Sequence, residues 1–141
     1  MTPIHELATA TFRASASYDP ASKVIIISNE GLIHEPTATE VWRKAVEFSK
    51  NNPSVAVLVD SEKLKGTFTK MNGFFKNEVV PSFEKVGIKY AYIGMTTDIF
   101  SRFALNQLLK ILSTGIDFKV FSTAKEAKET LQQKINSTIT T

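Results

Sequence analysis

The sequence predicts an α/β fold: a single domain, residues 1–141, with a mixed five-stranded sheet and four to five helices. Residues 9–18 alternate between apolar and polar side chains, which is typical of a strand with one buried face. Residues 54–59 are apolar on both faces, which is typical of a central parallel strand. Helix-capping signals stand between the later apolar runs, so strands and helices should alternate along most of the chain.

The N-terminal part predicts an antiparallel hairpin. Residues 9–18 form its first strand, with Phe12 and Tyr18 on the apolar face. A turn follows at 19–22, because Asp19 and Pro20 favour the first two positions of a β-turn. Residues 23–28 then form the second strand, and the hairpin becomes the antiparallel edge of the sheet.

The next unit predicts a helix followed by the central strand. Thr37 and Glu40 have the spacing of a capping box, so a helix should begin at Thr37 and continue to about Lys50. Residues 54–59 are the strand, and residues 61–66 form a polar connection after it. A further helix should begin at Thr67 or Thr69.

Pro81 should kink that helix or begin a second one, because proline cannot donate to the helical hydrogen-bond ladder. Gly87 should end it in a left-handed conformation. Residues 88–93 are the next strand, with Ile88, Tyr90 and Tyr92 on one face.

The C-terminal part predicts two more helices around a short strand. Thr97 or Asp98 should cap the first helix and Gly115 should close it. The helix residues expected to face the core are Phe100, Phe103, Ala104, Leu108, Ile111 and Leu112. Residues 117–121 form the last strand, a second capping box at 123–126 opens the last helix, and residues 136–141 form a frayed tail.

Composition excludes several classes of protein. Hydrophobic residues make up 43% of the chain and charged residues 22%, as in an ordinary globular domain. The absence of cysteine excludes disulfides and thiolate metal sites. We expect no signal peptide and no membrane span, because the apolar runs are far shorter than the roughly 20 residues that a span requires, and therefore a cytoplasmic protein. The net charge of +3 comes from scattered lysines, so nucleic acid is not expected as a partner.

No pattern of catalytic, metal-binding or cofactor-binding residues is recognisable. His5 and His34 are the two histidines, and neither belongs to a pair with metal-ligand spacing. The chain has no G-x-S-x-G nucleophile elbow, no G-x-x-x-x-G-K-[ST] loop and no G-x-G-x-x-G motif. We therefore expect no catalytic residues, no metal and no cofactor.

The candidate site follows from the fold. Ligands of open α/β sheets bind beyond the carboxyl ends of the parallel strands, where helix N-termini offer free N–H groups. The residues expected at this edge are Asp60, Ser61, Lys63, Lys65, Gly66, Thr67, Thr69, Thr97 and Asp98. The lysines favour an anionic visitor, such as a carboxylate, a phosphate or an acidic partner loop. The alternative is that these threonines and aspartates only cap helices and that the lysines are only solvated.

Several short blocks carry a family resemblance. They are Val57-Leu58-Val59-Asp60, Leu64-Lys65-Gly66, Val80-Pro81, Gly87-Ile88-Lys89, Asp98-Ile99-Phe100 and Phe121-Ser122-Thr123-Ala124-Lys125-Glu126-Ala127. Over roughly residues 9–135 the chain resembles the SpoIIAA-like, or STAS-type, fold that bacterial anti-sigma-factor antagonists share. It looks most like a branch of small bacterial proteins whose fold is also related to CRAL-TRIO lipid-binding domains. The shared blocks are packing and capping signals, so the resemblance implies a fold more than an activity.

The resemblance also implies one candidate phosphoacceptor. In the antagonists a D-S-x-G-L motif places, at a helix N-terminus, a serine that a partner kinase phosphorylates. The matching position here is Thr69, although Phe68 and Met71-Asn72-Gly73 depart from that motif.

Two functions from different classes therefore stand. The first is a non-enzymatic regulatory or protein-interaction module of the STAS-like type, whose partner is another protein or a second copy of the chain in a homodimer. Large aromatic side chains in excess of what the core can hold would support it. The second is a small-ligand-binding protein for a lipid-like or anionic molecule. An enzyme ranks third, because no acid–base pair or nucleophile can be named.

Overall fold

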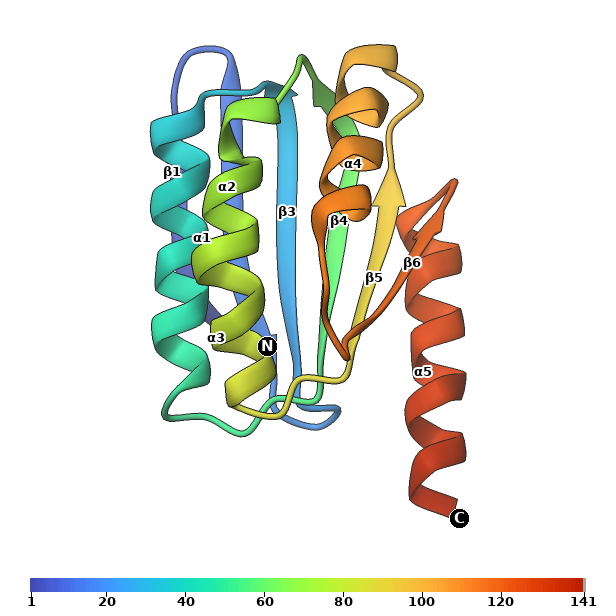
Figure 1. Ribbon diagram of the computed structural model, residues 1–141. Coiled ribbons are helices and arrows are strands. Elements are labelled where there is room, and N and C mark those ends of the chain that lie inside the picture. The colour runs from blue at the N-terminus through green and yellow to red at the C-terminus, as the bar shows by residue number, and fades with distance from the viewer. Residues whose placement is uncertain (141) are drawn as a thin grey trace.

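The computed structural model describes residues 1–140 of the chain, and the side chains of residues 1–137. It shows a mixed six-stranded sheet whose spatial order, β1-β2-β3-β4-β5-β6, is also the order of the strands in the sequence (Figure 1). The strands are β1 (Thr2–Ala8), β2 (Phe12–Asp19), β3 (Val24–Leu32), β4 (Ala56–Lys65), β5 (Tyr90–Met95) and β6 (Asp117–Phe121). β1, β2 and β3 pair antiparallel, and β3 to β6 pair parallel. The predicted α/β class and the parallel pairing are confirmed.

The expectation of five strands is wrong, because β1 adds a sixth at the edge beside β2. β1 has little apolar alternation, and Pro3 within it is typical of an edge strand, where one N–H is not needed by the ladder. Only Ile4 and Leu7 of β1 pack, partly buried, against the core. Pairing with β2, rather than a hydrophobic pattern of its own, makes this segment a strand.

Four helical segments complete the fold. They are α1 (Glu35–Ser49), a continuous segment made of η1 (Thr69–Met71), α2 (Asn72–Phe74), η2 (Phe75–Val79) and α3 (Val80–Lys85), then α4 (Ile99–Ile111) and α5 (Ala124–Thr140). Within residues 1–140 no helix combines the length and the apolarity needed to cross a membrane.

The ends of the helices differ in part from the predicted ones. α1 begins earlier than the expected Thr37 cap: His34 is its N-cap, Pro36 occupies the first turn, and the Thr37 hydroxyl contacts His34 Nδ1 at 2.7 Å. Proline suits this first turn, where no N–H is needed. α4 ends at Ile111, before the expected Gly115. α5 includes the segment expected to form a frayed tail as far as Thr140, and its fraying stays a prediction; Thr141 lies outside the described residues.

The direction of the sheet explains where the helices lie. Each parallel connection runs to the neighbouring strand in the same direction, and such crossovers are right-handed, so their helices all pack on one face. α1, the 69–85 segment and α4 accordingly cover one face, and α5 packs on the opposite face against β4, β5 and β6 (Figure 1).

Two cores result. The larger lies under α1, the 69–85 segment and α4, and it contains the predicted Phe12–Tyr18 face of β2. The smaller lies under α5 and contains Tyr92, whose hydroxyl donates to Asp117 Oδ2 at 3.1 Å. Ile88 does not share the face of Tyr92 as expected, because it precedes β5 and packs in the larger core.

The predicted core face of α4 is partly wrong. Phe100 and Phe103 are 60% and 57% exposed, and Ile111 is 41% exposed, whereas Leu105 and Leu108 are buried. The helix carries apolar residues nearly all round, so periodicity alone does not select its inner face. That face is set by the small residues Ser101 and Ala104, both without exposed area, which let the helix approach the sheet.

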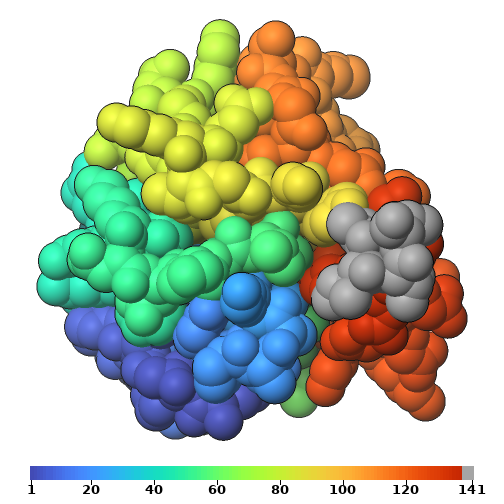
Figure 2. Space-filling model, turned by 90° about the horizontal axis from the view of Figure 1, so that it is seen from below, coloured from blue at the N-terminus to red at the C-terminus, as the bar shows by residue number. Residues whose placement is uncertain are grey.

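The amino ends of the parallel strands are closed by backbone hydrogen bonds between successive connections. Val55 N donates to Lys23 O, Lys89 N to Val55 O and Asp117 N to Lys89 O, at 2.8–2.9 Å. Figure 2 views this end of the molecule and shows these connections packed side by side. A ligand is therefore better accommodated at the other end of the sheet or between its layers.

Candidate functional site

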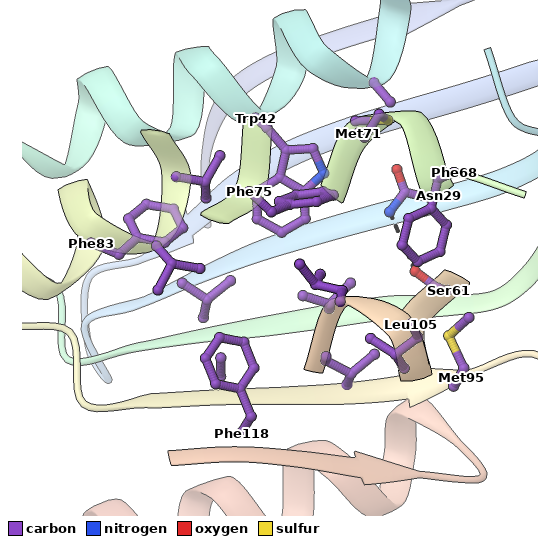
Figure 3. A pocket seen from close by; sticks show the side chains of 18 of the residues that line it. Asn29, Trp42, Ser61, Phe68, Met71, Phe75, Phe83, Met95, Leu105 and Phe118 are labelled. Carbon is purple, nitrogen blue, oxygen red and sulfur yellow. Dashed lines mark hydrogen bonds between the residues drawn. The ribbon is translucent and has the colours of Figure 1, made fainter. Parts of the chain in front are cut away.

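A cavity of about 90 Å³ lies in the larger core, between the sheet and the helices on its covered face (Figure 3). Its walls come from β3 to β6, from α1, the 69–85 segment and α4, and from the connections between them. The lining residues are Asn29, Ile33, Ala38, Trp42, Val57, Val59, Ser61, Leu64, Phe68, Met71, Phe75, Val79, Val80, Phe83, Ile88, Ala91, Ile93, Met95, Leu105, Leu108, Ile116 and Phe118. All but Asn29 and Ser61 have apolar side chains, so the lining of the cavity suits an apolar molecule.

The two polar side chains of the cavity lie together at one end. Asn29 of β3 and Ser61 of β4 are 8% and 4% exposed, and Asn29 Nδ2 donates to Ser61 Oγ at 3.3 Å. Figure 3 shows this pair beside Phe68, at the opposite end of the cavity from Phe83. A ligand in the cavity would therefore find polar partners at one end only.

A β-bulge in β4 lies opposite Asn29. In the pairing of β3 with β4, Ser28 faces Asp60 and Glu30 faces Lys63, so Ser61 and Glu62 together oppose the single Asn29. The extra residue shifts the alternation of β4, and Leu64 instead of Lys63 then packs in the larger core. Ser61 lies on the inner face with Val57 and Val59 by simple alternation, and the bulge keeps the exposed Lys63 ammonium outside the cavity.

The π-helical turn η2 supplies another part of the wall. Phe75 and Val79, its first and last residues, both line the cavity, and Phe75 packs edge-on against Trp42 with ring centroids 5.1 Å apart. Pro81 follows in the first turn of α3, so the predicted disturbance by this proline takes the form of a changed helical winding. π-turns of this kind occur frequently at functional sites.

The predicted edge residues do not form one site. Ser61 and Asp60 lie within β4, which extends six residues past Val59 to Lys65, and not in a connection. Ser61 points into the cavity, while Lys63, Lys65, Thr97 and Asp98 line an open groove at the carboxyl edge of the sheet. That groove also holds Arg13, Glu30 and Glu62. Its charges are mixed, so it has no strong preference for an anion.

Gly66, Thr67 and Thr69 lie at the start of the connection after β4. Gly66 has a φ of +89°, which favours glycine, and its N–H donates to Asp98 Oδ2 at 3.1 Å. The hydroxyls of Thr67 and Thr69 are 2.6 Å apart, and both residues are exposed. Thr69 is therefore accessible at the surface, and its role as a phosphoacceptor stays a prediction.

Asp98 is the predicted cap of α4 and also links two elements. Its Oδ2 accepts from Ser101 N at 3.0 Å and from Gly66 N, while Ser101 Oγ donates to Gly66 O at 2.6 Å. The hydrogen bond from the Ser101 backbone, with further ones from Gly66, the Ser101 side chain and Phe100, holds the pKa of Asp98 below its ordinary value. Asp98 and Ser101 are thus occupied in fixing α4 to the end of β4.

The sequence gives little warning of the cavity. A packed core and a hollow one have the same hydrophobic periodicity, so the pattern of apolar residues does not reveal the cavity. Asn29 and Ser61 are polar residues on the inner faces of their strands, and this pattern could have indicated a polar site inside the core. It was missed because the central strand was predicted to end before Ser61. Among the described residues no group of three or more histidine, aspartate or glutamate side chains is placed to hold a metal ion.

Comparisons with known proteins add no family. No protein-family model matches the chain, and no curated protein matches it significantly. The class that fold and site define is therefore an α/β domain with an internal apolar cavity, and its function is argued from that cavity.

Proposed function

We propose that this protein is a non-enzymatic small-ligand-binding domain that takes up an apolar molecule in its internal cavity. The observation that carries the proposal is a cavity of about 90 Å³ with apolar walls inside the larger core. Empty apolar volume costs stability, so a folded protein keeps it where something fills it.

The proposal agrees with the resemblance to the SpoIIAA-like fold. That resemblance rests on the order of elements along the chain, and the related folds that it implies include lipid-binding domains. A cavity under those helices supports the ligand-binding member of the two functions that the sequence left open.

Filling the cavity tests the proposal. Ala91 lines the cavity on β5, and Ala127 lies on the opposite side of the sheet in the smaller core. Methyl NMR of the wild type titrated with pentane should show shifts at cavity residues. The Ala91→Val variant should lose this binding and keep or gain stability, by up to about 1 kcal/mol, because the added methyl groups occupy empty space.

The matched control is Ala127→Val, the same substitution outside the cavity. It should bind pentane as the wild type does, although overpacking there should lower stability by about 1–3 kcal/mol. Absence of cavity shifts in the wild type, or equal loss of binding in both variants, would contradict the proposal.

The interaction module is the second candidate, and the exposed face of α4 favours it. Ile99, Phe100 and Phe103 are all more than half exposed, and such a cluster often marks an interaction surface. A STAS-like regulatory module would use this face for a protein partner or for a second copy of the chain. If a second copy is the partner, sedimentation of the wild type at increasing concentration should show a homodimer. The double substitution Phe100→Ser, Phe103→Ser should return it to a monomer. A wild type that stays monomeric at high micromolar concentration would count against self-association.

A further inference from the structure

The polar end of the cavity narrows the ligand to one chemical class. Building on the proposed function, we infer that the ligand is a small uncharged molecule with one hydroxyl or an equivalent neutral oxygen group, which points to Asn29 and Ser61 while its apolar body lies among the aromatic side chains. Three features of the cavity lead to this class.

The first feature is the hydrogen-bonding capacity of the pair. Asn29 Nδ2 uses one donor on Ser61 Oγ. In the part of the chain that the structure describes, neither the hydroxyl hydrogen of Ser61 nor Oδ1 of Asn29 has a further partner. Besides the second hydrogen on Asn29 Nδ2, the pair therefore offers the O–H donor of Ser61 and the C=O acceptor of Asn29, and a hydroxyl group suits both because it accepts and donates.

The second feature is charge. Of the described residues that line the cavity, none carries a charged side chain. A buried carboxylate, phosphate or ammonium would have no counter-charge there, and burying such an ion unpaired costs far more than burying a neutral group. The bulge in β4 strengthens this selection, since it keeps Lys63 on the exposed side. An anionic ligand, which the lysines of the edge suggested, does not suit this cavity.

The third feature is size. A cavity of about 150 Å³ is known to hold benzene, and this one measures about 90 Å³. By the same proportion, a ligand that enters without moving the walls has about four non-hydrogen atoms, fewer than the six of benzene. A ligand of five non-hydrogen atoms or more has to displace a wall residue, and the partly exposed aromatic residues of the wall that could move are Trp42, Phe75 and Phe118.

A matched set of probes tests the inference. Butan-1-ol, pentane and butylammonium have the same number of non-hydrogen atoms and differ in the end group, and butanoate adds the anion. Each is titrated at pH 7 into the full chain, and binding is followed by methyl NMR of the cavity residues. Butan-1-ol should bind at least about tenfold more tightly than butanoate or butylammonium.

Substitutions at the polar end separate this inference from the proposed function. Ser61→Ala should weaken butan-1-ol about three- to tenfold, the value of one hydrogen bond, and change pentane less than twofold. Ser61→Thr keeps the hydroxyl and should keep the preference for butan-1-ol over the ions. Ser28→Ala is the control, because Ser28 precedes Asn29 on β3 and faces the other side of the sheet.

The outcomes are distinct. If no probe shifts cavity methyl groups, both the proposed function and this inference fail. If pentane binds but butanoate binds as tightly as butan-1-ol, or if Ser61→Ala weakens pentane and butan-1-ol equally, the cavity binds ligands and the assigned class is wrong. Melting temperatures of the variants show whether each one is folded before its binding is compared.

Discussion

Asp98 shows how one side chain joins two elements. As the N-cap of α4 it satisfies the Ser101 N–H, and through Gly66 N it holds the residue that ends β4. The capping role was predicted from the sequence, because an aspartate before an apolar helix is a common start signal. The hydrogen bond from Gly66 N was not predicted, because it joins residues 32 positions apart and no local pattern indicates it.

This arrangement predicts a dependence of stability on pH. The folded state holds the pKa of Asp98 below its ordinary value of 3.8, so the ionised form stabilises the fold above that pH. The contribution is lost as the pH falls through the folded-state pKa. Melting temperatures of the wild type and Asp98→Asn should therefore differ most near neutral pH and converge in acid, and a constant difference from pH 7 to pH 3 would contradict this role.

Ser61 shows why the candidate site was only partly predicted. Its neighbours Asp60, Glu62 and Lys63 are polar, so the strand appeared to end before it. The bulge opposite Asn29 allows the strand to continue, and a bulge is a feature of pairing that a single strand's pattern does not reveal. Asp60 to Lys65 lie within β4, and only Gly66 to Thr69 follow it, so the strand was predicted too short. Ser61 lines the cavity by alternation, and the bulge leaves Lys63 in the groove.

At the scale of elements, α4 presents two apolar faces. Leu105 and Leu108 line the cavity, whereas Phe100 and Phe103 are exposed. Phe103→Ala should therefore change the free energy of unfolding by no more than about 0.5 kcal/mol. Leu105→Ala should lower it by about 2–5 kcal/mol, because it removes buried methyl groups.

Chemical denaturation of the two variants checks the assignment of faces. The sequence alone had placed Phe103 in the core, so the two variants separate that expectation from the structure. A loss of several kcal/mol for Phe103→Ala in a monomeric protein would mean that the inner face of α4 is misassigned.

The docking of α5 depends on one glycine. A Cβ built on Gly94 of β5 would lie 2.7 Å from the carbonyl carbon of Thr123 and closer still to the backbone of Ala124. Gly94→Ala must therefore push the start of α5 away from the sheet, at a cost of about 1–3 kcal/mol. Hydrogen exchange should rise in α5 and in β6 more than in α1, and uniform exchange rates across the molecule would contradict local displacement.

Elements with a clear local sequence pattern were predicted, whereas β1, which forms a strand by pairing with β2, was not. The turn at 19–22, strand 117–121 and the Thr123 cap, whose Oγ1 accepts from Glu126 N at 3.1 Å, all appear where expected. β1 was missed because its residues carry no apolar alternation. The wider lesson is that pairing can override a weak local pattern.

At the scale of the whole molecule, the class of fold followed from the alternation of strands and helices alone. The side on which the helices lie follows as well, once the strand order is known and crossovers are right-handed. The cavity could not be predicted from the sequence, because its volume is the space that many side chains from β3 to β6 and their helices leave unfilled when they pack. This unfilled volume is a property of the whole folded molecule and not of any one element.

The identity of strand order and chain order has a consequence for biosynthesis. A ribosome releases the N-terminus first, so every strand after β1 emerges when its preceding neighbour in the sheet has already been made. The sheet can grow at a single edge as translation proceeds. Because Phe118 of β6 is part of the cavity wall, the cavity is complete only after this strand has emerged.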